Sequence, residues 1–108
     1  MTKREVKEYL QNYRTCMARI QRLKTDIDIF TASASSIREE MEDCRKVCQN
    51  IEKHISKHKD FMEREILIRK YIYGDTVEEI AEAMNYSERQ IQRIADKGIL
   101  RMAETLAV

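Results

Sequence analysis

The chain of 108 residues is long enough for one small domain, or for one small domain with an extension. Two glycines, no proline and 36% charged residues predict long helices with few turns and argue against a single large core. The formal net charge of +1 argues against a partner held by overall basic character, and the three cysteines are too few for a secreted disulfide scaffold.

Apolar residues repeat with a heptad period over the first part of the chain. With Val6 at position a, the remaining a and d positions hold Tyr9, Tyr13, Cys16, Ile20, Leu23, Ile27 and Phe30. Four heptads of this kind predict a long amphipathic helix whose apolar seam packs against a partner.

The helical pattern breaks at residues 31–36, "TASASS", where small and hydroxyl-bearing side chains compete with the helical backbone. A second apolar seam follows at Ile37, Met41, Cys44, Cys48, Ile51, Ile55, His58 and Met62. Two long helices joined by a short polar connection favour an antiparallel hairpin. The alternative is one continuous helix that dimerises in parallel.

Shorter helices are expected after residue 60. The segment 61–74, "FMEREILIRKYIYG", predicts a helix that Gly74 terminates. Thr76 and Glu79 form a capping-box pattern at the start of a short helix that ends near Met84.

A tight turn and a last helix complete the expected elements. Asn85 tolerates the left-handed conformation that such a turn requires. Ser87 and Gln90 form a second capping-box pattern, which opens a helix that extends to about Leu106. Gly98 lies inside this helix and marks either a bend or a close packing contact.

These elements predict an all-α protein with an antiparallel helical hairpin (a coiled coil) at 1–59 and a helix-turn-helix domain at 60–108. The expected core of the second domain is shared by three helices and consists of Ile66, Ile72, Ile80, Ala81, Met84, Tyr86, Ile91 and Ile94. Ala81 is small where the last helix is expected to cross closely.

Ile91, Ile94 and Gly98 are expected to face the core from one side of the last helix. The other side of this helix carries cations in i, i+4 steps, at Arg89, Arg93, Lys97 and Arg101. In a helix-turn-helix the first residues of the second helix meet base edges, where Arg pairs with guanine and Gln with adenine. Thr76 and the first amides of the preceding helix suit a phosphate. The predicted DNA-binding residues are Thr76, Ser87, Glu88, Arg89, Gln90, Gln92, Arg93 and Lys97.

The local charge balance supports two interpretations. Residues 60–108 contain seven basic and ten acidic residues, a net charge of −3, whereas residues 87–103 contain four basic and two acidic residues, a net charge of +2. A cationic row of this kind also occurs as an ordinary solvated helix face. The acids concentrate on the preceding helix at Glu78, Glu79 and Glu82, which favours a protein–protein adaptor as the alternative function.

The C-terminal stretch "EREILIRKYIYGDTVEEIAEAMNYSERQIQRIADKGILRM" resembles the DNA-binding region four of sigma-seventy-type factors. With a helical hairpin before it, the whole chain is similar to the ArpU-type late-gene regulators of phages and prophages. The resemblance implies that Ser87, Arg89, Gln90, Gln92 and Arg93 contact promoter DNA, and that RNA polymerase is a partner. Asn85 and Glu88 depart from the family pattern, and the remaining regions of a sigma factor are missing, so the resemblance implies an accessory transcription regulator.

Cysteine and histidine pairs at i, i+4 spacing, Cys44 with Cys48 and His54 with His58, invite a zinc hypothesis. However, Cys44 and His58 are fourteen residues apart on one helix, which is about 21 Å at 1.5 Å per residue. Four ligands on such a rod do not converge on one tetrahedral ion. No nucleophile–base pair or phosphate-binding glycine loop is present either, so no metal, cofactor or catalysis is expected.

The cationic face of the last helix and the resemblance to a DNA-binding region make double-stranded DNA the expected partner. Leu10, Met17, Val47 and apolar residues of the last helix exceed what a two-helix seam needs, so either the last helix packs on the hairpin or two chains associate. A homodimer through the hairpin is favoured, and a small terminase-like packaging subunit is a further alternative. Without a signal-peptide pattern or an apolar stretch of about 18 residues, the chain is expected to be soluble and cytoplasmic, in a bacterial or phage-infected cell.

Overall fold

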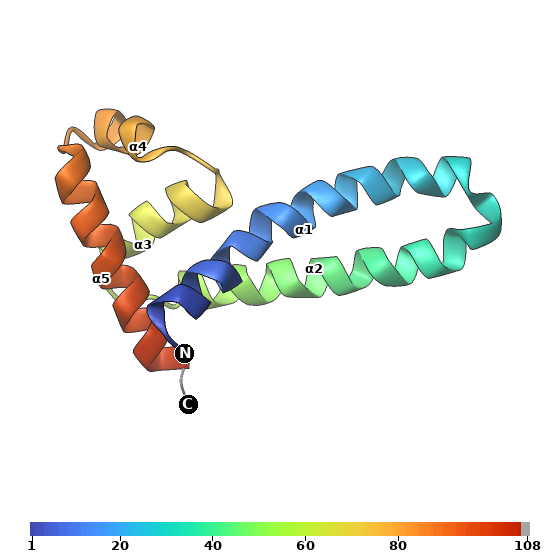
Figure 1. Ribbon diagram of the computed structural model, residues 1–108, viewed down its shortest axis with the longest axis horizontal. Coiled ribbons are helices and arrows are strands. Elements are labelled where there is room, and N and C mark those ends of the chain that lie inside the picture. Colours follow the sequence, from blue (N-terminus) through green and yellow to red (C-terminus); the bar gives the residue numbers. More distant parts are fainter. Residues whose placement is uncertain (107–108) are drawn as a thin grey trace.

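The computed structural model describes residues 1–106, which form an all-α fold without a β-strand (Figure 1). The α-helices are α1 (Lys3–Ile29), α2 (Ala34–Ser56), α3 (Phe61–Leu67), α4 (Val77–Met84) and α5 (Glu88–Leu106). A 3₁₀ turn, η1 (Thr31–Ser33), links α1 to α2, and a π-helical turn, η2 (Ile68–Ile72), follows α3. A long arm formed by α1 and α2 extends from a lobe formed by α3, α4 and α5, and the molecule measures 51 × 34 × 20 Å.

The arm is the predicted antiparallel hairpin, and the alternative of one continuous helix is wrong. Thr2 caps α1 through a capping box with Glu5, in which the Glu5 N–H donates to the Thr2 hydroxyl at 3.2 Å. The segment η1 reverses the chain because Phe30 leaves the helical conformation. The distal half of the hairpin is closed by a cluster of buried side chains: Ile20, Leu23, Ile37, Met41 and Cys44.

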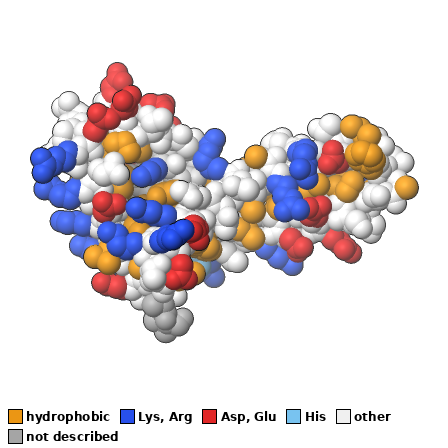
Figure 2. Space-filling view, viewed as in Figure 1, with side chains coloured by type: hydrophobic (Ala, Val, Ile, Leu, Met, Phe, Trp, Pro, Cys, Tyr) orange, Lys and Arg blue, Asp and Glu red, His pale blue; other side chains and the backbone are white. Residues whose placement is uncertain are grey.

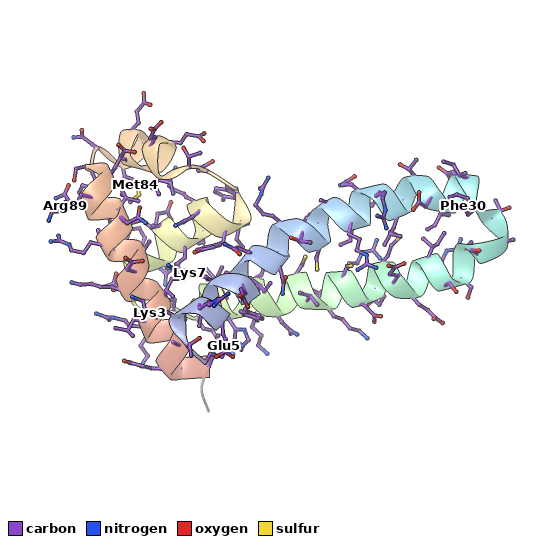
Figure 3. All side chains as sticks on the ribbon, in the orientation of Figure 1. Lys3, Glu5, Lys7, Phe30, Met84 and Arg89 are labelled. Atoms are coloured by element: carbon purple, nitrogen blue, oxygen red, sulfur yellow. The ribbon has the colours of Figure 1, made fainter. Side chains whose placement is uncertain are left out.

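The predicted seams differ from the structure at their ends, because α2 ends at Ser56, before His58 and Met62, and α1 ends at Ile29, before Phe30. Phe30, expected in the seam, is 56% exposed, and its neighbour Ile29 is 64% exposed. Because α1 ends at Ile29, the helical period no longer directs Phe30 toward α2, and it lies at the tip of the arm (Figure 3).

A second apolar cluster joins the arm to the lobe. Its buried members are Val6, Leu10, Tyr13, Cys48, Ile51, Ile55, Leu67, Tyr71, Ile99, Met102 and Ala103. The last helix therefore packs on the hairpin, which accounts for much of the apolar excess noted beside the seams. The predicted domains 1–59 and 60–108 meet at the link between α2 and α3, but side chains from both domains form this cluster, which we call the shared core. Residues 107–108 of the second predicted domain lie outside the described part of the chain.

The helix predicted for 61–74 is not a regular α-helix over its whole length. It widens after Leu67, and in η2 the Tyr73 N–H donates to the Ile68 carbonyl at 3.1 Å. Gly74 ends the segment with a φ of 77°, as expected for its role as a helix stop. One predicted contact in this segment is wrong. Ile72 packs against the shared core rather than among the three C-terminal helices.

The turn between α4 and α5 has the predicted capping on both sides. The Thr76 hydroxyl accepts the Glu79 N–H at 3.2 Å, and the Ser87 hydroxyl accepts the Gln90 N–H at 3.2 Å. At the end of α4, Asn85 is left-handed with a φ of 57°. Three residues, 85–87, thus separate the two helices, as the sequence predicts, while their use in DNA recognition stays a prediction.

Asn85→Ala is expected to lower the free energy of unfolding by about 1 kcal/mol, because alanine has no side chain that compensates for left-handed backbone. Asn85→Gly is expected to leave stability unchanged or to raise it slightly. Urea titration of the two variants measures both effects, and equal stability of alanine and glycine at this position would contradict the role assigned to the turn.

A third apolar cluster holds α3, α4 and α5 together and contains Ile66, Ile80, Ala81, Ile91 and Ala95, with Val77, Met84 and Ile94 packed against it. This confirms most of the predicted core. The exceptions are Ile72, which packs against the shared core, and Tyr86, a residue that is 39% exposed. Gly98 marks a close contact: a Cβ at this position would lie 3.1 Å from Leu67 Cδ1. The small residue lets α3 and α5 approach.

Candidate nucleic-acid interface

An open groove of about 580 Å³ runs along the solvent face of α5. It is lined by Lys3, Ser87, Arg89, Gln90, Gln92, Arg93, Asp96, Lys97 and Leu100. The α5 residues in this set recur at steps of three and four, because Ile91, Ala95 and Ile99 occupy the opposite, buried face. Burial of one face of α5 therefore fixes which side chains are presented to a ligand.

The three cations predicted to read DNA are exposed and available. Arg89, Arg93 and Lys97 all lie on the groove face. Within residues 1–106, none of them forms an ion pair with an acidic side chain. From Arg89 to Lys97 the helix rises about 12 Å, which is comparable to the width of the major groove of B-DNA.

The two glutamines at the start of α5 differ in their hydrogen bonding. The Gln90 Oε1 atom accepts the Ser87 N–H at 2.9 Å and also the Ser87 hydroxyl at 3.1 Å. Gln90 therefore lacks a free oxygen for the bidentate contact with adenine, for which both its oxygen and its nitrogen are needed. Gln92 lines the groove without such an engagement among the described residues and is the better candidate for this contact.

Two predicted DNA-binding residues lie outside the groove. Thr76 caps α4, where its hydroxyl accepts the Glu79 N–H, and it is not a groove-lining residue. Glu88 is the first residue of α5 and is exposed, yet it does not line the groove either. The structure thus brings together Ser87, Arg89, Gln90, Gln92, Arg93 and Lys97, but not Thr76 or Glu88.

The sequence did not indicate that α1 contributes to this face. Lys3 of α1 lines the groove together with the α5 residues, and Lys7, one helical turn later, forms an ion pair with Asp96 at 4.0 Å. Figure 3 shows both lysines on the part of α1 that lies next to α5. Lys7 also lies near Lys70, whose pKa is lowered first by burial and then by the charge of Lys7. The only signal in the sequence was the apolar excess of α1 and α5.

Charges are separated over the surface of the lobe. Figure 2 shows many Lys and Arg side chains over α5 and the start of α1, with some acidic side chains among them, and a group of acidic side chains over α4. Glu78, Glu79 and Glu82 of α4 are all exposed. An anion is therefore attracted to the α5 face and repelled by the outer surface of α4.

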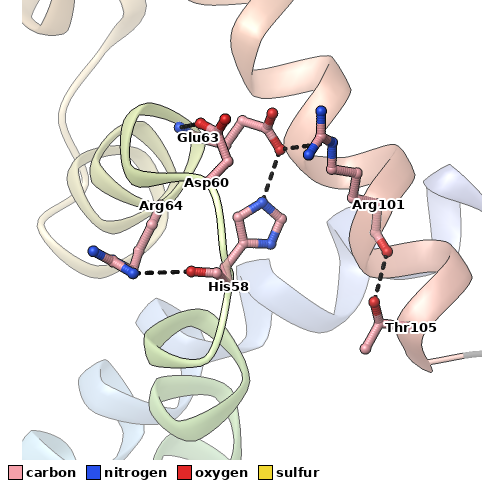
Figure 4. Close-up of polar contacts among 6 residues, drawn as sticks. All are labelled: His58, Asp60, Glu63, Arg64, Arg101 and Thr105. Atoms are coloured by element: carbon pink, nitrogen blue, oxygen red, sulfur yellow. Dashed lines mark hydrogen bonds and ion pairs between the residues drawn. The ribbon is translucent and has the colours of Figure 1, made fainter.

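Arg101 has a different role from the other cations of the predicted row. Its Nε atom lies 3.4 Å from Glu63 Oε1, which also lies 2.8 Å from His58 Nε2 (Figure 4). His58 and Glu63 are buried, and the Arg64 guanidinium donates to the His58 carbonyl at 3.0 Å. This polar network links the residues that follow α2 to α3 and α5, so Arg101, unlike Arg89, Arg93 and Lys97, is paired with an acidic side chain.

The cysteine and histidine pairs serve separate packing contacts. Cys44 and Cys48 face α1, while the His54 ring is hydrogen-bonded to the Tyr9 hydroxyl and the His58 ring to Glu63. Among the described residues, no group of three or more His, Cys, Asp or Glu side chains is arranged to hold a metal ion. Burial raises the pKa of Cys48 to about 11, so its thiol is protonated and a weak nucleophile at neutral pH.

No family model matches the chain, and neither a curated protein nor a solved structure matches it. None of the helices formed by residues 1–106 is both long and apolar enough to cross a lipid bilayer.

Proposed function

We propose that the protein is a sequence-specific DNA-binding regulator of transcription that reads double-stranded DNA with α5. The observation that carries the proposal is the exposed face of α5, on which Arg89, Gln92 and Arg93 line one groove; neither arginine forms an ion pair with another of the residues 1–106. These are the side-chain types that make bidentate contacts with guanine and adenine in the major groove.

The three-helix arrangement supports this use of α5. Helix α4 and the turn at 85–87 hold the first residues of α5 at the surface of the lobe, while α3 packs behind them. Rigid support of this kind lets a recognition helix enter a groove as one body. The resemblance to region four of sigma factors agrees with the proposal and adds RNA polymerase as a candidate second partner.

The charge separation favours one alternative. The exposed acids of α4 would be repelled by a phosphate backbone, whereas they suit a basic protein surface. In a protein–protein adaptor, α4 would bind such a partner and the α5 face would remain solvated. In the DNA-binding proposal, the same acids restrict the approach of DNA to the α5 side.

Selection of bound fragments from a random DNA pool, at low and at moderate salt, is expected to enrich one sequence motif. Arg93→Ala and Arg89→Ala are each expected to weaken binding to that motif by about 1–3 kcal/mol, roughly 5- to 150-fold, and to relax the preference at one position. Equilibrium binding to the selected motif and to single-base variants of it measures both quantities.

Arg38→Ala is the matched control, because Arg38 is an exposed arginine of α2 on the arm, outside the groove. It removes the same charge and is expected to leave the preferred sequence unchanged. Enrichment of no motif, or a motif that survives both α5 substitutions unchanged, would exclude α5 as the reading element and favour the adaptor.

A further inference from the structure

We infer that the first turn of α1 is part of the DNA-binding surface, and that Lys3 holds a phosphate of the DNA backbone beside α5. The inference rests on the proposed function and extends it, because it assigns to the hairpin a direct role in binding. It starts from the groove, where Lys3 is, among residues 1–106, the one lining residue outside the segment 87–100.

The position of Lys3 is fixed by packing over the next two turns of α1. Val6 and Leu10 are completely buried in the shared core, to which Ile99 and Met102 of α5 also belong, and α1 packs against α5. This contact places the start of α1 alongside the middle of α5. Lys3 lies on the exposed side of that contact and forms no ion pair with another described residue.

The start of α1 also changes the electrostatics of the groove. Asp96 is the one acidic side chain among the groove-lining residues, and Lys7 lies 4.0 Å from its carboxylate. Lys7 thereby offsets the charge that would repel a phosphate, and Lys3 adds a cation of its own. The groove carries Lys3, Arg89, Arg93 and Lys97 as its basic groups, so the face is more positive than α5 alone.

The ligand that fits this arrangement is the sugar–phosphate backbone at the edge of a major groove. Arg89, Gln92 and Arg93 occupy the N-terminal part of α5, where base edges are met. Lys3 lines the groove from a separate helix, α1, and its single charged group at the end of a flexible chain suits a phosphate rather than a base. Contacts of this type strengthen binding to every sequence alike.

The test uses the full-length protein and a random-sequence duplex of three helical turns, titrated by fluorescence anisotropy at several salt concentrations. Lys3→Gln is expected to weaken binding about fivefold at low salt and to reduce the slope of log K against log salt by about one. The same loss is expected for any other duplex, because the contact carries no sequence information. Lys3→Arg, which retains the charge, is expected to restore most of the affinity.

Lys24→Gln is the matched control, since Lys24 is an exposed lysine of the same helix about 30 Å further along its axis. If Lys3→Gln and Lys24→Gln show the same affinity and salt slope as the unaltered protein, while Arg93→Ala weakens binding to the selected motif, the inference fails and the proposed function stands. If the unaltered protein binds no duplex at low salt, the proposed function fails and the inference fails with it.

Discussion

Glu63→Ala is expected to destabilise the protein by about 3 kcal/mol or more, because it removes the centre of a buried polar network. The Glu63 side chain is 4% exposed and its Oε1 atom lies near both His58 Nε2 and Arg101 Nε. Without the carboxylate, the buried His58 ring nitrogen loses its hydrogen-bond partner and the Arg101 guanidinium loses its counter-ion. Urea unfolding followed by circular dichroism measures the difference.

Two further substitutions distinguish the effect of breaking the buried network from the effect of removing one negative charge. Glu63→Gln retains the size of the side chain and one acceptor oxygen, so a smaller loss is expected. Glu65→Ala removes a carboxylate of the same helix that pairs with Arg69 in a partly exposed position, and it is expected to cost less than Glu63→Ala, on the order of 1 kcal/mol. Equal losses for Glu63→Ala and Glu65→Ala would show that burial of the network contributes nothing to stability.

The parts of the fold that the sequence predicts are those that depend on near neighbours. Thr76 with Glu79 and Ser87 with Gln90 act over three residues, and both capping boxes are present as expected. Asn85 adopts its left-handed conformation for an equally local reason. The exposed face of α5 could be predicted in the same way, because the helical period sets it once Ile91 is buried.

The parts that the sequence could not predict depend on tertiary packing. Lys3 and the α5 cations are more than eighty residues apart, and no local pattern places them on one groove. Arg101 continues the spacing of the cationic row, so its pairing with Glu63 becomes visible only after α3 and α5 are packed. Likewise, Gly98 was consistent with either a bend or a close contact, and only the position of Leu67 decides in favour of the contact.

Leu10→Ala is expected to lower the free energy of unfolding by about 2–5 kcal/mol and to destabilise both the arm and the lobe. Leu10 is completely buried in the shared core, where α1 meets α5, so truncation leaves a cavity between the two parts. Native-state hydrogen exchange distinguishes local from joint effects. Because one cooperative unit opens together, the slowest amides of α2 and of α5 are expected to lose protection by the same amount.

Ile27→Ala provides the comparison, because Ile27 is only partly buried and packs against the distal cluster of the arm, away from α5. It is expected to cost less and to leave the protection of α5 amides nearly unchanged. If Leu10→Ala instead weakens α2 while α5 keeps its full protection, the arm and the lobe fold independently.

A rigid connection between the arm and the lobe matters for the proposed function, because the packing of α1 on α5 also holds the start of α1 beside α5. An arm that unfolded separately would leave Lys3 without a fixed place in the groove, so the contribution to DNA affinity proposed for Lys3 is expected to fall when Leu10 is truncated.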